Sequence, residues 1–230
     1  MSLADELRIH KTMILTDLDA AHDYFHATRY SLRAIQQLAA SGQSITIDNT
    51  VTGNITTEKD FPGKAHLYIN ENLAVSTLQQ FVGLFEDFLF GLLRLWLQAH
   101  PLKLGRKQIQ AAVVFEAATL DEVKAVIIDR ELNELAYKRV REWFEYLDSL
   151  VHLGVPTTEH IGFLAEMKAT RDIFIHNRGI ANAIYEEKAG SNKRFSAGEP
   201  MTVPEAYHQS SWELIKKVVR EVSDAAIDKA

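Results

Sequence analysis

Apolar residues recur at a helical spacing along most of this chain. In residues 3–40 they lie mostly three, four or seven positions apart: Leu7, Ile14, Leu18, Ala21, Phe25, Leu32, Ile35 and Leu38. The same spacing returns in residues 69–99, 120–151 and 205–228. Helices with one apolar face bury that face against one another. We therefore predict an all-α helical bundle.

Turn-forming residues divide the helical stretches. We expect one long helix to stop near Pro101 and the next to end before Gly154. Thr157 or Thr158 is a suitable N-cap for a helix that runs toward His176. The remaining predicted segments are a short helix at 106–118, a helix at 180–188 after a break at Gly179, and a surface connection at 190–204.

The region between Ser41 and Gly63 has a different composition. Isolated apolar residues alternate there with threonine, aspartate, asparagine and glycine: Ile45, Ile47, Val51 and Ile55. Alternation of this kind indicates a short hairpin, so we predict a small β-like insertion near residues 44–57. A chain of 230 residues can bury one large core, and we predict a single domain spanning residues 1–230.

The residue counts exclude several kinds of site. The chain has no cysteine, so it forms neither a disulfide framework nor a thiolate zinc site. Its net charge of −6 offers no global attraction for nucleic acid, so RNA contact would need a local or oligomer-assembled basic cluster. The apolar run at 81–97 is interrupted by Glu86, Asp87 and Arg94, which favours a buried helix over a membrane span. Because the first ten residues lack a signal-peptide run, we expect a cytoplasmic protein with no membrane partner.

The stretch from Arg171 to Arg178 carries the most informative polar residues. Three apolar residues separate Arg171-Asp172 from His176, and an Asn-Arg-Gly sequence follows the histidine at once. On an ideal helix a five-residue separation turns roughly 140°, so Arg171 and His176 would not share a face. They can converge if the helix frays at His176, or if each residue meets its counterpart from a second subunit.

An arginine and a histidine suit the cleavage of RNA without a metal. An imidazole titrates near neutrality and can move a proton to or from a ribose hydroxyl or a leaving oxygen. A guanidinium binds a phosphate and stabilises the charge that develops there. RNA supplies its own nucleophile, the 2′-hydroxyl. The alternative from the residues alone is structural: Arg171 is a surface cation, and His176 interacts with the dipole at the end of its helix.

Residues 170–182, with Tyr185 behind them, resemble the Arg-x4–6-His signature of the HEPN superfamily. The segment looks closest to bacterial members in which Asn-Arg/Gly-Gly and then Asn and Tyr follow the histidine. Residues 78–93 of the helix expected at 69–99, with Phe85-Glu86, are similar to the family's upstream helix bearing an acidic or polar residue. Gly198-Glu199-Pro200 and the helix after it look like the closing segment. The resemblance covers residues 70–228, which would form the motif-bearing core, while residues 1–69 would add an N-terminal helix and the insertion.

This resemblance implies a HEPN-like helical bundle that pairs as a homodimer, with the Arg and His of both subunits lining a shared cleft. Many members are metal-independent endoribonucleases, without cofactors, that leave a 2′,3′-cyclic phosphate and a 5′-hydroxyl. They often act as toxins of toxin–antitoxin pairs or as defence effectors held in check by a protein partner. Other members have lost the motif and serve as modules that bind a nucleotide, an RNA or a protein. The implied catalytic residues are Arg171 and His176, and the implied supporting residues are Glu86, Asp172, Asn177, Arg178, Asn182 and Tyr185.

Two carboxylates, Asp172 and Glu86, are expected close to Arg171. Active members often have asparagine after the arginine, whereas this chain has Asp172, which could orient Arg171 or His176 or could repel RNA. Glu86 projects from an apolar stripe of its helix, where an unpaired carboxylate is costly. We expect Arg171 to be the partner of Glu86, either as part of the catalytic site or as a purely structural ion pair.

Three weaker signals complete the set of candidates. Two Asp-x-x-His steps lie on one predicted helix, formed by Asp19, His22, Asp23 and His26, and Glu205 and His208 offer a second contribution. A metal-dependent enzyme is therefore a third hypothesis. The simpler interpretation is a solvated helix face. The side chains interpreted as core packing are Trp96, Trp143, Phe144 and Trp212. The small basic patch is Lys188, Lys193 and Arg194, interpreted as a solvated loop with RNA phosphate contact as the alternative.

Overall fold

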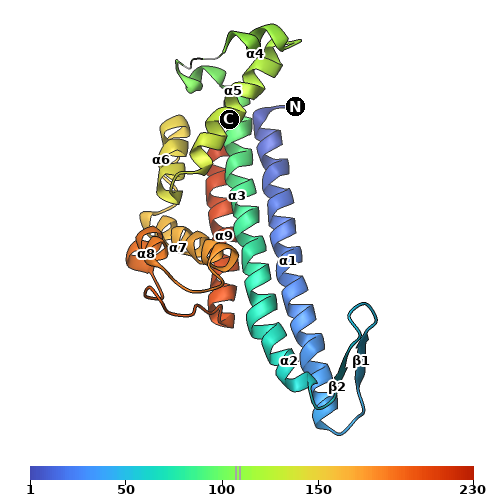
Figure 1. The fold of residues 1–230 in the computed structure, drawn as a ribbon. Coiled ribbons are helices and arrows are strands. Elements are labelled where there is room, and N and C mark those ends of the chain that lie inside the picture. The colour runs from blue at the N-terminus through green and yellow to red at the C-terminus, as the bar shows by residue number, and fades with distance from the viewer. Residues whose placement is uncertain (107, 109) are drawn as a thin grey trace.

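Three long helices form the main layer of the protein. The computed structural model describes residues 1–106, 108 and 110–230. α1 (Leu3–Ala40), α3 (Ala74–Ala99) and α9 (Glu205–Ile227) run side by side (Figure 1) and contact one another in every pairing. α1 begins at Ser2, whose side chain forms a capping box with Asp5. The predicted all-α bundle is confirmed.

The second helical stretch begins earlier than its apolar spacing predicted. α2 (Phe61–Leu67) leads through the π-helical turn η1 (Tyr68–Leu73) directly into α3, so the chain is helical from residue 61 to residue 99. A π turn inserts an extra residue and shifts the positions that face the core, which interrupts the 3.6-residue period. The helix ends at His100, next to Pro101, as expected, and the short 3-10 turn η2 (Pro101–Leu104) follows.

The predicted β-like insertion is a two-stranded hairpin. β1 (Thr46–Asn49) pairs antiparallel with β2 (Asn54–Thr57), with Thr46 opposite Thr57. The hairpin lies beside the end of α1, away from the helices that carry the motif (Figure 1).

The prediction of a single helix at 120–151 is wrong. The chain forms two helices, α5 (Leu120–Ala136) and α6 (Val140–Val151), separated by a turn. The Trp143 indole donates a hydrogen bond of 2.8 Å back to the carbonyl of Leu135, and Glu142 caps the Arg139 amide. No glycine or proline marks this turn, and apolar residues keep their spacing across it, so the pattern did not reveal the break. The helix predicted at 106–118 is α4 (Ala111–Glu116), and the part of the prediction at residues 107 and 109 lies outside the described residues.

The helix that carries the motif begins as predicted. α7 (Thr158–His176) has Thr157 as its N-cap and passes beside α3 and α9. After a turn, α8 (Ala183–Ala189) packs back against α7, and the 3-10 turn η3 (Gly190–Asn192) follows; the helix predicted at 180–188 is thus shorter. The segment predicted as a surface connection at 190–204 is partly wrong, because it returns to the core with Met201 and Val203 buried.

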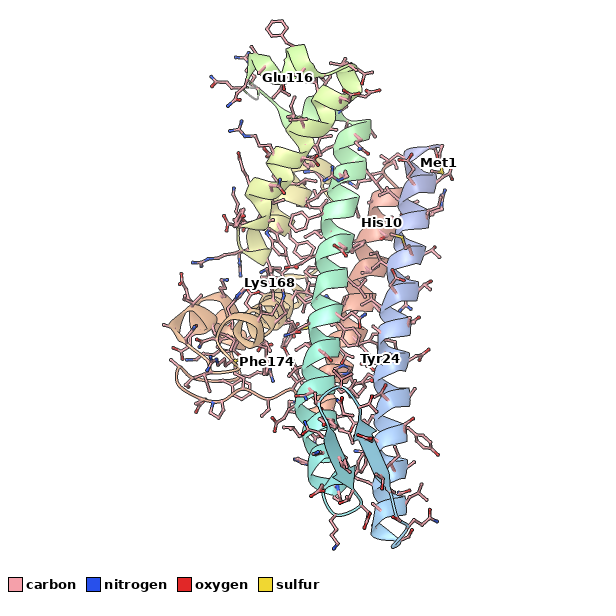
Figure 2. All side chains as sticks on the ribbon, turned by 45° about the vertical axis from the view of Figure 1, so that its right-hand side comes forward. Met1, His10, Tyr24, Glu116, Lys168 and Phe174 are labelled. Atoms are coloured by element: carbon pink, nitrogen blue, oxygen red, sulfur yellow. The ribbon has the colours of Figure 1, made fainter. Side chains whose placement is uncertain are left out.

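The core joins residues of α1, α3, α5, α6, α7 and α9 in one continuous cluster of buried side chains. Trp96, Trp143 and Phe144 are buried in it and Trp212 packs against it, so their interpretation as core residues is confirmed. Figure 2 labels Lys168 and Phe174, which lie where α7 passes α3. Among the described helices, none is long and apolar enough to cross a membrane.

Candidate functional site

Arg171 lies on the face of α7 that meets α3. Its guanidinium forms an ion pair with Glu86 of α3 and a second one, at 3.4 Å, with the neighbouring Asp172. The predicted pairing of Glu86 with Arg171 is therefore confirmed. The Arg171 side chain is 17% exposed, and its Nε atom is buried without a hydrogen-bond partner in the described part of the chain. Two carboxylates thus fix the guanidinium and leave one of its donors unused.

Two lysines complete the set of charges around Arg171. Lys168 lies 3.6 Å from Glu86 and 3.2 Å from Asp172, and Lys188 of α8 lies 3.2 Å from Asp172. We call these five side chains, Glu86, Lys168, Arg171, Asp172 and Lys188, the Arg171 cluster. Three cations face two carboxylates, so the cluster keeps one net positive charge.

Asp172 stays ionised in this setting. Burial, the largest single influence, raises the pKa of its carboxyl, but the charges of Lys168 and Arg171 and hydrogen bonds from Lys168 and Lys188 outweigh it. The net result is a pKa below the ordinary value. The negative charge of Asp172 is therefore matched within the protein, which reduces the repulsion that a bare carboxylate would exert on a phosphate.

His176 is the last residue of α7, and its side chain is exposed. In the described residues no hydrogen bond or ion pair joins it to Arg171 or to any other side chain. Arg171 faces inward to α3 while His176 lies at the solvent-facing helix end. Within one chain the structure does not bring the two predicted catalytic residues together.

The Asn-Arg-Gly sequence after His176 forms the turn that ends α7. The Asn177 amide N–H donates to the Ile173 carbonyl at 2.8 Å, and the Asn177 side chain donates to the Ile180 carbonyl. Arg178 has φ 53° and Gly179 has φ 75°, both in the left-handed region. Asn177 therefore has a structural function in this turn.

Both the close packing around position 179 and its backbone conformation favour glycine there. A Cβ atom at Gly179 would lie 3.0 Å from the ring of Phe174. Its carbonyl accepts a hydrogen bond of 2.7 Å from Met201, and Ala181 donates one of 2.9 Å to Glu199. These bonds attach the Gly198–Pro200 segment to the turn, so the two parts of the resemblance lie side by side.

Asn182 and Tyr185 also stabilise the structure after the motif. The Asn182 side chain caps α8 by accepting the Tyr185 amide hydrogen bond at 2.9 Å. Tyr185 is buried, and its hydroxyl donates to Glu166 of α7 at 2.8 Å. Both side chains therefore position the segments that follow the motif.

Glu166 was not predicted, yet it lies at the centre of the best-connected polar group near the motif. It is 2% exposed and accepts hydrogen bonds from four side chains at 2.6–2.9 Å: Thr170, Tyr185, Arg194 and Tyr207. We call these five residues the Glu166 cluster. Thr170 follows Glu166 by four residues on the buried side of α7, which was the signal available in the sequence.

The interpretation of the basic patch as a solvated loop is wrong for Arg194. Its guanidinium donates to Glu166 at 2.9 Å and lies 3.4 Å from the centre of the Tyr207 ring. Lys193 pairs with Glu186 at 2.5 Å, and Lys188 belongs to the Arg171 cluster. Burial raises the pKa of Tyr185 to about 12 and also raises that of Tyr207, so both hydroxyls remain protonated donors to Glu166.

The histidines of α1 have other partners. His22 Nε2 lies 2.8 Å from the Gln209 side-chain oxygen and 3.2 Å from His26 Nε2, and its ring stacks on Trp212. His208 is buried and bonds to Thr77 at 2.7 Å; burial, with the nearby His22, His26 and Arg29, lowers its pKa to about 3. Two of the three candidate carboxylates form ion pairs elsewhere: Glu205 pairs with Arg29, and Asp19 pairs with Lys216. Across the described residues, no group of three or more histidine or acidic side chains is placed to hold a metal ion, so the third hypothesis gains no support.

Comparison of the chain with protein-family models, with characterised proteins and with solved structures gives no match. The resemblance to the HEPN superfamily therefore rests on the motif residues and on the order of the helices around them.

Proposed function

We propose that this protein is a HEPN-type, metal-independent endoribonuclease that acts as a homodimer. Arg171 and His176 of both subunits would line the shared cleft. The observation that carries the proposal is an exposed imidazole at the end of α7, without a partner among the described residues, on the same helix as a guanidinium oriented by Glu86 and Asp172.

The reaction needs two proton transfers and one site of charge stabilisation. The ribose 2′-oxygen attacks the phosphorus while an imidazole removes its proton, and the bond from phosphorus to the 5′-oxygen breaks. A second proton transfer, from imidazolium, completes the 5′-hydroxyl and leaves a 2′,3′-cyclic phosphate. Arg171, whose side chain is 17% exposed, stabilises the negative charge that builds on the phosphate oxygens.

The separation of Arg171 from His176 within one chain supports a dimer. Arg171 faces α3, whereas His176 faces solvent at the helix end. A second copy related by a two-fold axis brings another His176, so that one imidazole serves as base and the other as acid. Each Arg171 cluster contributes one net positive charge to the shared cleft, which makes the cleft locally basic although the chain carries a net charge of −6.

The test is RNA cleavage by the purified full-length protein in the presence of a chelator. Wild-type protein should cut single-stranded RNA to fragments with cyclic phosphate ends. His176→Ala should lower the rate by about 10²–10⁴-fold, as expected for a lost proton-transfer group. Arg171→Ala should also abolish cleavage with the helical circular dichroism unchanged. His100→Ala, an exposed histidine outside the site, is the matched control and should cut at the wild-type rate.

A second candidate function is supported by the same ion pairs. Because Glu86 and Asp172 occupy the guanidinium and leave 17% of the Arg171 side chain exposed, the cluster can also be purely structural. The protein is then a non-catalytic module that binds a nucleotide, an RNA or a protein partner. Absence of cleavage by wild type, together with a tightly held partner after purification, selects this alternative.

We also propose that the protein acts in the cytoplasm as a toxin or defence effector. A free endoribonuclease would damage its host, so an antitoxin or other regulatory protein would restrain it. Growth arrest on expression of wild type, and normal growth with His176→Ala, would support that part of the proposal.

A further inference from the structure

A pocket of about 610 Å³ opens beside the turn that ends α7. One wall comes from η1 and the first turns of α3, with Asn72 and Gln79, and the other from the motif turn, with Phe174 and Arg178. Met201 also lines it. We call it the η1 pocket. Its volume is within the range of small-molecule sites and is large enough for one nucleoside.

Four of the polar side chains that line the η1 pocket lack a partner among the described residues. In the described part of the chain, no hydrogen bond or ion pair involves the side chains of Glu71, Asn72, Gln79 or Arg178. Each amide offers both donors and an acceptor, as the edges of nucleobases require. Apolar side chains, including Phe174 and Met201, supply a surface for the flat face of a base.

The charges in the η1 pocket favour a base over a phosphate. The pocket holds one carboxylate, Glu71, and one guanidinium, Arg178, so it carries no net positive charge. Glu71 accepts hydrogen bonds and therefore suits a base with an exocyclic amino group, such as adenine, guanine or cytosine. Uracil lacks that group.

The pocket lies along the same helix face as the Arg171 cluster. Gln79 and Glu86 are seven residues apart on α3, which places them on one face about 10 Å apart along the helix. Phe174 and Arg178 follow Arg171 by three and seven residues. An RNA strand with its phosphate at Arg171 can therefore place a neighbouring base in the η1 pocket.

We infer that the η1 pocket binds an amino-bearing nucleobase of the RNA next to the cleaved bond and so determines where the strand is cut. This inference rests on the proposed endoribonuclease function. Arg178, which lines the pocket from the left-handed turn at φ 53°, holds the adjoining phosphate.

The binding test uses full-length His176→Ala protein and two mononucleotides, 5′-AMP and 5′-UMP, in ligand-observed NMR titrations. AMP should bind about tenfold tighter than UMP, as one base-edge contact is expected to discriminate. The double change Asn72→Ala with Gln79→Ala should weaken AMP binding on the order of tenfold or more, since two amide contacts are lost. Gln80→Ala is the matched control, because Gln80 adjoins Gln79 but does not line the pocket. Equal binding of AMP and UMP, or unchanged binding by the double variant, overturns the inference.

A cleavage assay separates this inference from the proposed function. If wild type cuts RNA through Arg171 and His176, and the double variant keeps the same cut sites and the same KM, the pocket inference fails and the function stands. If AMP binds in the η1 pocket but no RNA is cut, the endoribonuclease proposal fails and only base binding stands. Support for both requires that the double variant raise KM or change the preferred base while Gln80→Ala does neither.

Discussion

α7 carries two groups of polar side chains that differ in how completely their atoms are matched. In the Glu166 cluster a carboxylate that is 2% exposed accepts hydrogen bonds from four side chains. In the Arg171 cluster the charged groups are partly exposed, and Arg171 keeps a buried Nε–H without a partner in the described residues. A complete network stabilises one structure, whereas an incomplete network leaves a polar group whose hydrogen bond is not made.

The two clusters also differ in the segments that they join. The Glu166 cluster joins α7 to Tyr185 of α8, to Arg194 after it, and to Tyr207 of α9. It therefore fixes the segments on both sides of the turn after His176. The Arg171 cluster joins α7 to α3 and leaves its positive charge near solvent. We expect the first cluster to contribute stability, and the proposed function needs the charge of the second.

Replacing Glu166 and Glu86 in turn should give the largest difference between the two clusters. Glu166→Ala leaves Arg194 and two tyrosine hydroxyls without their acceptor and should lower the free energy of unfolding by about 3–5 kcal/mol. Glu86→Ala, at a carboxylate that is 25% exposed, should cost about 1 kcal/mol or less. Urea unfolding followed by circular dichroism measures both. Equal losses in the two variants would contradict the division into a structural and a functional cluster.

The sequence predicted the parts of this arrangement that depend on local spacing. The long helices followed from the 3.6-residue period, and Thr157 marked the start of α7. The Glu86–Arg171 ion pair could also be predicted, because each residue is a charged group on an otherwise apolar helix face.

Pairings distant in sequence could not be read from local patterns. Arg194 lies 28 positions from Glu166, in a segment whose composition indicates a solvated loop. Nothing in the spacing of residues 190–204 shows that the segment turns back to bond with Gly179. The turn between α5 and α6 was missed for a related reason: it contains neither glycine nor proline, and a hydrogen bond from Trp143 stabilises it.

Gly179→Ala tests whether the turn that ends α7 depends on its backbone conformation. The left-handed φ of 75° and the contact with Phe174 should together lower the free energy of unfolding by about 1–2 kcal/mol. Gly83→Ala is the matched control, since it lies inside α3 with no atom near the added Cβ, and it should stabilise by about 0.5–1 kcal/mol. Thermal unfolding of both variants gives the comparison, and a neutral Gly179→Ala would show that the turn relaxes freely.

Asp172→Asn should give the smallest effect and sharpens the assignment of the Arg171 cluster. The folded-state pKa of Asp172 lies below the ordinary value of 3.8, so its charge contributes stability above pH 3.8 that is lost as the pH falls through the folded-state pKa. Wild type should therefore be more stable than Asp172→Asn near neutrality, by about 1 kcal/mol or less, and the difference should shrink in acid. Paired unfolding curves from pH 7 to pH 3 measure it. RNA cleavage should persist in this variant, because asparagine keeps an oxygen acceptor beside Arg171; loss of cleavage with stability unchanged would instead make the Asp172 charge part of the reaction.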